Sequence, residues 1–201
     1  MPGTATETST TGEHLLAAFE YEVNAHARYD VYAARTYHEG LYTGVVCLFR
    51  AVARAEEVHA ANHVWALRRS GGTIHCESRS FLVGTTLEQL KIALDSERYE
   101  GETMYPKFLE EAEAAKDALA IRTFHYALQA EKSHAQLFSR AIELIDSAAT
   151  DSWVTSTRHF FVCPACGFVS EERDRNLKCP VCAGLQRWFE EIPGNRVSSP
   201  R

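Results

Sequence analysis

The stretch Ala130-Glu131-Lys132-Ser133-His134 repeats the pattern of Ala55-Glu56-Glu57-Val58-His59, which lies 75 residues earlier. In both stretches a glutamate and a histidine stand three positions apart on an apolar stripe of helical period, where leucine is usual. This spacing places both side chains on one helix face, so each helix offers an oxygen and a nitrogen ligand to the same cluster. The sequence therefore predicts two helices that direct metal-binding pairs into a shared interior.

Two further helical stripes carry carboxylates among apolar residues. Glu22 lies on the first stripe, and Glu97 and Glu100 lie on the third. Burying one unpaired carboxylate costs several kcal/mol, and here five would converge with two imidazoles. Lysine and arginine fall mainly on other faces of these helices. One or more multivalent cations are therefore the simplest partners for the cluster.

One offset relates the two halves of this cluster. Glu97 follows Glu22 by 75 residues, the same separation as between the two Glu-x-x-His pairs, which predicts a quasi-twofold cage for two metal ions. Glu100 has no counterpart, because position 25 is Ala25. One metal therefore has a wider choice of ligands than the other. Carboxylate oxygens with one or two imidazoles suit iron or manganese better than structural zinc.

The segment from Glu13 to Ser147 reads as four long helices with little strand signal. Glycines end the first two helices, and Asp117 is a suitable cap for the fourth. We expect a bend at Pro106 in the third helix and one long crossover, over 70–84, between the second and third. The expected helices are 13–38, 43–70, 87–115 and 117–146. The predicted fold class is mainly α, a four-helix bundle over 12–148 that follows a flexible tail at 1–11.

The composition suits an ordinary soluble protein. The chain has 201 residues, of which 45% are hydrophobic and 24% charged. Its longest uncharged apolar run is far shorter than the ~20 residues that cross a bilayer, and its first residues lack a signal-peptide pattern. We therefore expect a cytoplasmic protein with no membrane partner. The net charge of −6 argues against nucleic acid as a partner.

Four of the six cysteines form two knuckles, Cys163-Pro-Ala-Cys166 and Cys179-Pro-Val-Cys182. Two such pairs place four thiolates tetrahedrally around one ion. Zinc in a structural ribbon is the commonest occupant of such spacing, whereas iron makes a one-electron carrier. The Cys-Pro-x-Cys form and Phe168 favour iron. The module around these knuckles, 158–201, has too few apolar residues to fold without a metal.

Other residues near the stripes keep more than one interpretation. Tyr29 and Tyr105 suit hydrogen-bond donors to the carboxylates, and a plain aromatic core position explains their spacing equally well. We interpret His26, His63 and His125 as packed or surface histidines. Cys47 is interpreted as a buried small residue and Cys76 as a loop thiol.

Together these motifs resemble the rubrerythrin family, in which a ferritin-like four-helix bundle with a non-haem di-iron site precedes a rubredoxin-like iron domain. The resemblance runs from about Glu13 to Ile192. It rests on the two Glu-x-x-His pairs, both knuckles, and the segments Ala17–Glu22 with Arg28-Tyr29, Gly84–Lys91, and Glu97–Glu100 with Met104–Pro106. Alignment through Arg28-Tyr29 favours Glu22 over Glu20 as the ligand.

The resemblance implies two irons in the bundle and one iron, rather than zinc, between the four cysteines. Glu56 and Glu131 would bridge the two bundle irons. Glu22 and Glu97 would be terminal ligands.

The resemblance also implies a reaction and partners. His134 would bind one iron, and the other would exchange Glu100 for His59 as its oxidation state changes. The implied activity is that of a peroxidase in oxidative stress defence, which reduces hydrogen peroxide to water with electrons relayed through the four-cysteine iron. No nucleotide-binding glycine loop is present, so we expect a separate reductase or rubredoxin as donor. Family members are commonly homodimers, with one subunit's rubredoxin-like domain near the partner's di-iron site.

The chain departs from the family pattern at three positions. Tyr21 and Ser96 stand where glycine is common, directly before the first-helix and third-helix glutamates. Ala183 stands where the second knuckle usually has glycine, with Gly184 one position later. A positive φ costs a non-glycine knuckle residue about 1 kcal/mol or more.

Two other functions stay open at this point. The first is a ferroxidase or oxygen-reducing di-iron protein. The second is a metal-storage protein with a structural zinc ribbon.

Overall fold

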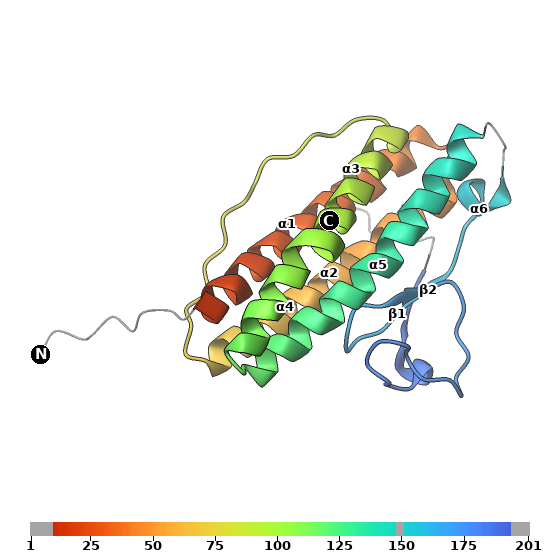
Figure 1. The fold of residues 1–201 in the computed structure, drawn as a ribbon. Coiled ribbons are helices and arrows are strands. Elements are labelled where there is room, and N and C mark those ends of the chain that lie inside the picture. Colours follow the sequence, from red (N-terminus) through yellow and green to blue (C-terminus); the bar gives the residue numbers. More distant parts are fainter. Residues whose placement is uncertain (1–9, 148–150, 194–201) are drawn as a thin grey trace, which may run out of the picture.

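The computed structural model describes residues 10–147 and 151–193, which form a helical bundle with a small module beside it (Figure 1). Three bundle helices are continuous: α1 (Thr10–Glu39), α2 (Thr43–Arg69) and α5 (Ala118–Asp146). The remaining one consists of α3 (Thr86–Tyr99), a π-helical segment η1 (Glu100–Met104) and α4 (Tyr105–Ala114). The predicted fold class is confirmed, since the chain is mainly α with a four-cysteine module.

The helix ends follow local chemistry. Gly40 adopts φ 75° directly after α1, and Gly71 adopts φ 81° after α2, conformations that favour glycine. Asp117 Oδ1 accepts hydrogen bonds from the amides of Leu119 and Ala120 at 3.1 Å and so caps α5. At the N-terminus, residues 1–9 of the expected tail lie outside the described residues, whereas Thr10 and Thr11 already belong to α1.

The third bundle helix is interrupted before the position that the sequence suggested. The expected bend was at Pro106, but that residue lies in the first turn of α4, where its missing N–H costs little. The interruption is the π-helical turn of η1, which begins at Glu100. Such turns add one residue to a helix and occur frequently at functional sites.

The apolar core has two parts with a polar layer between them. One part contains Leu15, Leu67 and Phe124, and the other contains Phe49 and Phe138. On α1, α2 and α5 the buried glutamates and histidines lie between the residues that each helix contributes to these two parts. The bundle therefore buries its charged groups at mid-height, with apolar packing above and below.

The connection between α2 and α3 runs along the outside of α1 (Figure 1). Side chains of α1 hold it through its backbone: Tyr32 donates a hydrogen bond to Leu82 O at 2.9 Å, and Asn24 Nδ2 donates one to Glu77 O at 3.0 Å. This long crossover agrees with the connection that the sequence predicts between the second and third helices.

The C-terminal module is a small antiparallel sheet of order β2-β1-β3 that carries both knuckles. Its elements are β1 (Phe160–Val162), β2 (Val169–Ser170), a 3-10 turn η2 (Gln186–Trp188) and β3 (Glu190–Ile192). In the register of β1 and β2, Val162 pairs with Val169 across the first knuckle.

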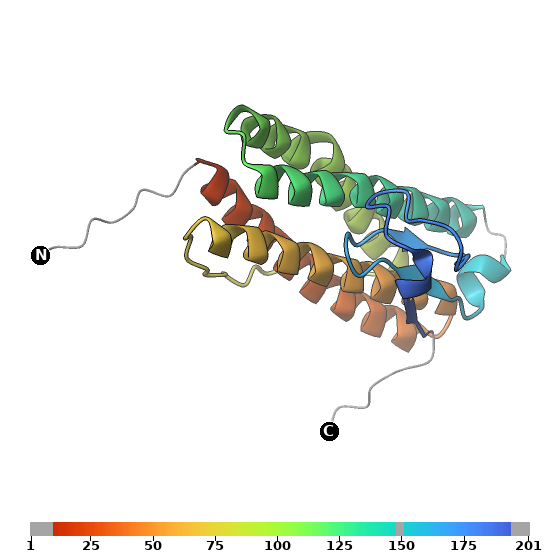
Figure 2. The ribbon, with the colours of Figure 1, turned by 90° about the horizontal axis from the view of Figure 1, so that it is seen from below.

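The module packs against α2 and α5 of the same chain (Figure 2). The Arg54 guanidinium on α2 donates to both carboxylate oxygens of Glu190, at 2.7 and 2.8 Å. On α5, Ser133 Oγ donates to Val169 O at 3.2 Å. None of the described helices is long and apolar enough to cross a membrane.

A short helix, α6 (Ser152–Thr155), lies between α5 and the module and is seated on the start of α2. Trp153 is buried there, and its indole N–H donates to Glu171 in the module. A Cβ on Gly44 would overlap the carbonyl oxygen of Trp153, so this seat requires glycine. Cys47 lies beneath α6 and accepts a hydrogen bond from the Arg158 amide at 3.4 Å.

Candidate metal centres

A polar layer crosses the middle of the bundle, where every helix contributes at least one carboxylate. The seven residues that the sequence singled out are each no more than 1% exposed: Glu22 on α1, Glu56 and His59 on α2, Glu97 on α3, Glu100 at the start of η1, and Glu131 and His134 on α5. All of them therefore face the interior, as the apolar stripes predict.

Six of these residues form two overlapping donor groups in which all ligand atoms lie within 4.8 Å of one another. Glu56 and Glu131 belong to both groups. Glu22 and His59 complete the first group, and Glu97 and His134 complete the second. Two groups that share two carboxylates are the arrangement that a pair of bridged cations needs, with one imidazole for each.

Buried donor atoms in this layer lack hydrogen bonds. Among the described residues, both carboxylate oxygens of Glu56, one oxygen each of Glu22 and Glu131, and His59 Nδ1 have no hydrogen bond of acceptable geometry, although His59 Nδ1 lies 2.9 Å from both Glu56 Oε2 and Glu131 Oε1. Buried polar atoms left unpaired are strongly destabilising unless a cation or proton neutralises them. The donor set therefore fits two resident cations, as the sequence predicts.

Without metal, protons take the place of these cations. Burial raises the pKa of Glu56 well above its usual value, and neighbouring carboxylates raise it further; burial and Glu131 raise the pKa of Glu97 to about 7. Burial opposes protonation of His59 and His134, but the charge of Glu131 outweighs it and raises both pKa values. Burial likewise opposes ionisation of Glu131, but the two imidazolium charges lower its pKa.

Two tyrosines donate to the carboxylates that lie on α1 and α3. The Tyr29 hydroxyl donates to Glu97, and the Tyr105 hydroxyl donates to Glu22. Burial raises the pKa of both tyrosines well above the usual value, so both stay neutral donors. Of the two interpretations that the sequence left open, the structure places these side chains in hydrogen-bond contact with the site.

His63 also lies beside the site, a position that its interpretation as a packed or surface histidine did not specify. It is fully buried one turn beyond His59, with Nε2 2.9 Å from the Tyr105 hydroxyl and Nδ1 3.0 Å from Thr123 Oγ1. Its position four residues after His59 on the same stripe was the available signal. His125, by contrast, is exposed on α5.

Glu100 lies outside both donor groups. Its Oε1 accepts a hydrogen bond from Ser96 Oγ at 3.2 Å, and its Oε2 is buried without a hydrogen-bond partner among the described residues. Ser96 in turn lies 2.9 Å from the Tyr21 hydroxyl. The two helix positions at which the chain departs from the family pattern are therefore in direct contact.

The four cysteines of the module converge as the spacing predicts. All four sulfurs lie within 4.8 Å of one another, and only Cys182 is partly exposed. Backbone turns shape the knuckles: the Cys163 amide donates to Phe168 O at 2.9 Å, and Gly167 has φ 78°. Ala183 has φ 59°, so the residue in place of the usual glycine does adopt the left-handed conformation.

The first knuckle touches the polar layer of the bundle. His59 Nε2 lies 3.0 Å from Cys166 O, and His134 Nε2 lies 3.2 Å from Gly167 O. Since a carbonyl oxygen only accepts, each Nε2 donates its N–H, and each Nδ1 faces the carboxylates. One stretch of backbone thus orients both imidazoles toward the carboxylates and joins the two candidate metal centres.

A family model described as Rubrerythrin matches residues 13–142. The chain belongs to the rubrerythrin family. It is 32% identical over 182 residues to Rubrerythrin-2 of Clostridium acetobutylicum, which covers 90% of this chain and 95% of that protein. It is also 30% identical to nigerythrin of Nitratidesulfovibrio vulgaris, over 88% of this chain and 84% of that protein.

Solved structures agree with this rubrerythrin assignment. A structure of fully reduced, all-ferrous nigerythrin superposes with a TM-score of 0.80 at 26% identity, over 95% of this chain and 91% of that one. Bacterioferritin BfrA of Mycobacterium tuberculosis superposes with a TM-score of 0.63 at 18% identity, over 68% of this chain and 86% of that one. The match with bacterioferritin concerns the fold alone, and it shows that the bundle has a ferritin-like fold.

Proposed function

We propose that this rubrerythrin is a non-haem di-iron peroxidase that reduces hydrogen peroxide to water, with electrons relayed through an iron bound by the four cysteines. The observation that carries the proposal is the direct contact between the two centres. Both imidazoles that face the carboxylates donate hydrogen bonds to the backbone of the first knuckle. A structural zinc ribbon would have no need of such a contact, whereas a one-electron relay requires its donor and acceptor to be close.

The proposed ligands follow the two donor groups. Glu56 and Glu131 would serve both irons, because both belong to each donor group. Glu22 and His59 would complete one iron site, and Glu97 and His134 would complete the other. Glu100, which belongs to neither group, would be an alternative ligand. The four module ligands would be Cys163, Cys166, Cys179 and Cys182. A pair of ferrous ions in such a site would supply the two electrons that split the O–O bond.

The protein's own groups would hold the protons and exclude water. The overall reaction consumes one hydrogen peroxide, two electrons and two protons and yields two waters. Tyr29 and Tyr105 each hold a phenolic proton against a ligand carboxylate. The fully buried ligands keep bulk water away from the site, which strengthens the electrostatic interactions inside it.

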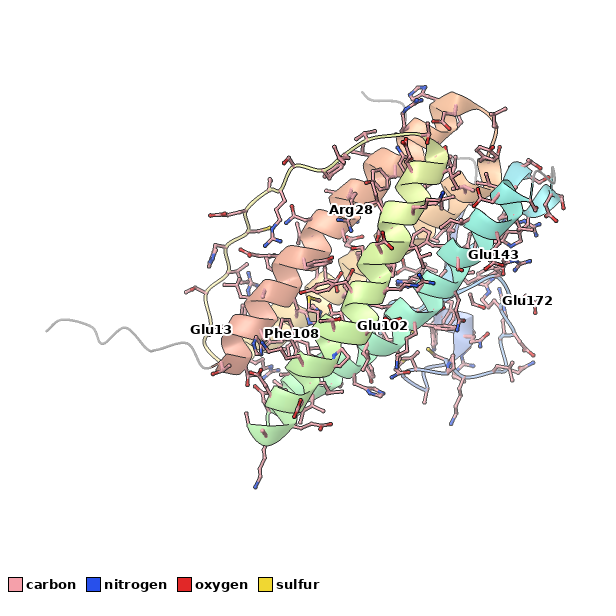
Figure 3. The ribbon with its side chains drawn as sticks, turned by 45° about the horizontal axis from the view of Figure 1, so that its top comes forward. Glu13, Arg28, Glu102, Phe108, Glu143 and Glu172 are labelled. Carbon is pink, nitrogen blue, oxygen red and sulfur yellow. The ribbon has the colours of Figure 1, made fainter. Side chains whose placement is uncertain are left out.

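A surface pocket of about 330 Å³ is the place where peroxide would approach this site. It lies between the third bundle helix and α5, and its walls include Glu97, Gly101, Glu102 and Lys132. Glu102, labelled in Figure 3, stands on η1 at the outer side of the bundle. Glu97 belongs to a donor group and its side chain is fully buried, so the pocket ends next to a proposed iron ligand that is itself closed to solvent.

The partners of this reaction are also proposals. The donor would be a separate reductase or rubredoxin that delivers electrons to the module. The homodimer and the cytoplasmic location that the sequence suggests stay predictions. The contacts between the module and its own bundle support a relay that brings the two centres together within one chain.

The test is stopped-flow oxidation of the fully reduced, iron-loaded protein by hydrogen peroxide and, separately, by oxygen. We expect about three irons per chain and faster oxidation by peroxide. Glu131→Gln should abolish the reaction, while Glu143→Gln, an exposed-face change on the same helix (Figure 3), should leave it unchanged. Faster oxidation by oxygen would favour the ferroxidase alternative. A colourless four-cysteine site that contains zinc would favour metal storage.

A further inference from the structure

A hydrogen bond from Ser96 explains why Glu100 lies outside both donor groups. Although fully buried in the polar layer, it belongs to neither donor group, and Ser96 Oγ donates to its Oε1 at 3.2 Å. Burial raises the pKa of Glu100 well above its usual value, and the charges of Glu22 and Glu131 raise it further. Release from Ser96 would therefore leave Glu100 free to act as one more carboxylate ligand.

Ser96 is itself held by two residues of α1. Arg28 Nη2 donates to Ser96 Oγ at 2.7 Å, and the Tyr21 hydroxyl lies 2.9 Å from the same oxygen. Arg28, labelled in Figure 3, lies between α1 and α3. A serine hydroxyl has one proton and accepts up to two hydrogen bonds. Its proton goes to Glu100, so both acceptor positions are taken, by Arg28 and Tyr21.

We propose that Ser96 is a positioning residue that, with Tyr21 and Arg28, holds Glu100 away from the metal-binding positions and leaves His59 as the ligand. The inference rests on the proposed di-iron function. The Cys166 carbonyl holds His59 from the opposite side at 3.0 Å, so both alternatives for one coordination position are fixed by their own hydrogen bonds. The bonds to Ser96 determine how readily Glu100 competes with His59.

The set of hydrogen bonds from Ser96, Tyr21 and Arg28, which we call the clamp, has a measurable consequence for the redox potential of the bundle site. An anionic carboxylate stabilises a ferric ion more than a neutral imidazole does, because the attraction grows with metal charge. Loss of the Ser96 hydroxyl should therefore favour the oxidised site. Hydrogen bonds to charged groups are worth enough to change such an equilibrium about tenfold or more.

The experiment measures the midpoint potential of the bundle site in the full-length, iron-loaded protein. Ser96→Ala should shift the preference for the oxidised site about tenfold or more, which is about 59 mV toward more negative potential for a one-electron step. Tyr21→Phe should shift it in the same direction by less, and Ser96→Thr, which keeps the hydroxyl, should restore it. Visible absorption of the cobalt-substituted protein gives a second readout, since an added carboxylate changes the spectrum.

The matched control is Ser139→Ala on α5. Ser139 Oγ donates to Glu143 Oε1 at 3.1 Å, which is the same serine-glutamate pair four residues apart, but this glutamate is exposed and is not a proposed ligand. This variant should keep the wild-type potential. A wild-type potential and cobalt spectrum in both Ser96→Ala and Tyr21→Phe would overturn the clamp. If Ser96→Ala fails to fold, Tyr21→Phe decides alone. Neither the midpoint potential nor the cobalt spectrum depends on peroxide turnover. A failure of the clamp hypothesis can therefore be distinguished from a failure of the proposed peroxidase function.

Discussion

Gly167 has two reasons to be glycine. Its φ of 78° lies in the left-handed region, and a Cβ there would overlap His59 Nε2 and lie 2.7 Å from His59 Cδ2. We predict that Gly167→Ala pushes the first knuckle away from the bundle and slows electron transfer from the module to the bundle site. A displacement of about 1 Å can cost on the order of a hundredfold in rate. Stopped-flow reduction of the oxidised bundle site through the module measures the effect.

Gly40→Ala separates backbone strain from this collision. Gly40 has φ 75°, but a Cβ there would meet no atom within 4 Å. It should therefore cost about 1–2 kcal/mol of stability without changing electron transfer. Equal transfer rates in Gly167→Ala and Gly40→Ala would show that the contact between knuckle and His59 is unimportant.

Ala183 carries backbone strain that glycine would remove. With φ 59° it sits in the second knuckle, and its amide donates to Cys179 O at 3.0 Å. Ala183→Gly should stabilise the module by about 1 kcal/mol, because glycine adopts this conformation without penalty. Bleaching of the iron-thiolate colour in denaturant measures module stability. Lys116→Gly, which relieves φ 56° in the bundle, should leave that midpoint unchanged.

The residues of the bundle centre were predictable because their chemistry conflicts with their position. A glutamate such as Glu56 on an apolar stripe is costly unless something neutralises it, and that conflict is visible in the sequence. The supporting contacts carry no such conflict. His63 and Ser96 are common types at helical positions, and only the crossing of α1 with α3 brings Ser96 to Tyr21.

At the scale of the helices, the metal-free bundle should be sensitive to pH. The folded state raises the pKa of Glu97 to about 7 and raises the pKa values of Glu56, His59 and His134 above their usual ranges. From about pH 4.5 upward the folded chain therefore binds more protons than the unfolded chain. Its free energy of unfolding should fall as pH rises, by ~1.4 kcal/mol per pH unit for each such proton.

Thermal unfolding of chelator-treated and iron-loaded protein between about pH 5 and about pH 8 checks this sign. The metal-free melting temperature should fall with rising pH, while the loaded protein should change little, since metal displaces the protons. Glu97→Gln should flatten the metal-free curve, because it removes one titrating group. Parallel curves for the two forms would contradict the proposed protonation. Glu131 has a lowered pKa, so its contribution makes the free energy of unfolding rise with pH, but only below about pH 4.5.

Helix ends were easier to predict than the interruption within the third helix. Gly40, Gly71 and Asp117 mark their ends through backbone conformation or capping, which are local effects. The π-helical turn at Glu100 is not local. Pro106 suggested a bend farther along the helix, yet a proline in the first turn of α4 fits without disruption. An added residue in a helix is accommodated by tertiary packing, which the sequence pattern does not display.

At the scale of the whole molecule, we predict that the relay operates within one chain. His59 and His134 contact Cys166 and Gly167 of the same chain, whereas the resemblance suggested a partner's module. Cys179→Ser, which disables the module, and Glu131→Gln, which disables the bundle site, should each abolish turnover. Co-expressed with different tags, the two variants should fail to restore it, because no chain holds both centres intact.

Recovery of peroxide turnover in the purified mixed assembly would show transfer between subunits instead. Co-expression of each variant with wild-type chain is the control for assembly and should retain activity. The placement of the module was not predictable from the sequence. It depends on contacts such as Arg54 with Glu190, whose partners are 136 residues apart and each resemble ordinary surface charges.

The seat of Trp153 on Gly44 also determines how the module meets its target. Because α6 is fastened to the start of α2, the module that follows it stays at an effective concentration of millimolar order or higher around the bundle. In the proposed relay the internal electron step would then follow first-order kinetics and would not slow on dilution. Only the encounter with the proposed external donor would depend on how much protein the cell contains, so scarcity of the protein would limit reloading of the module rather than delivery from it.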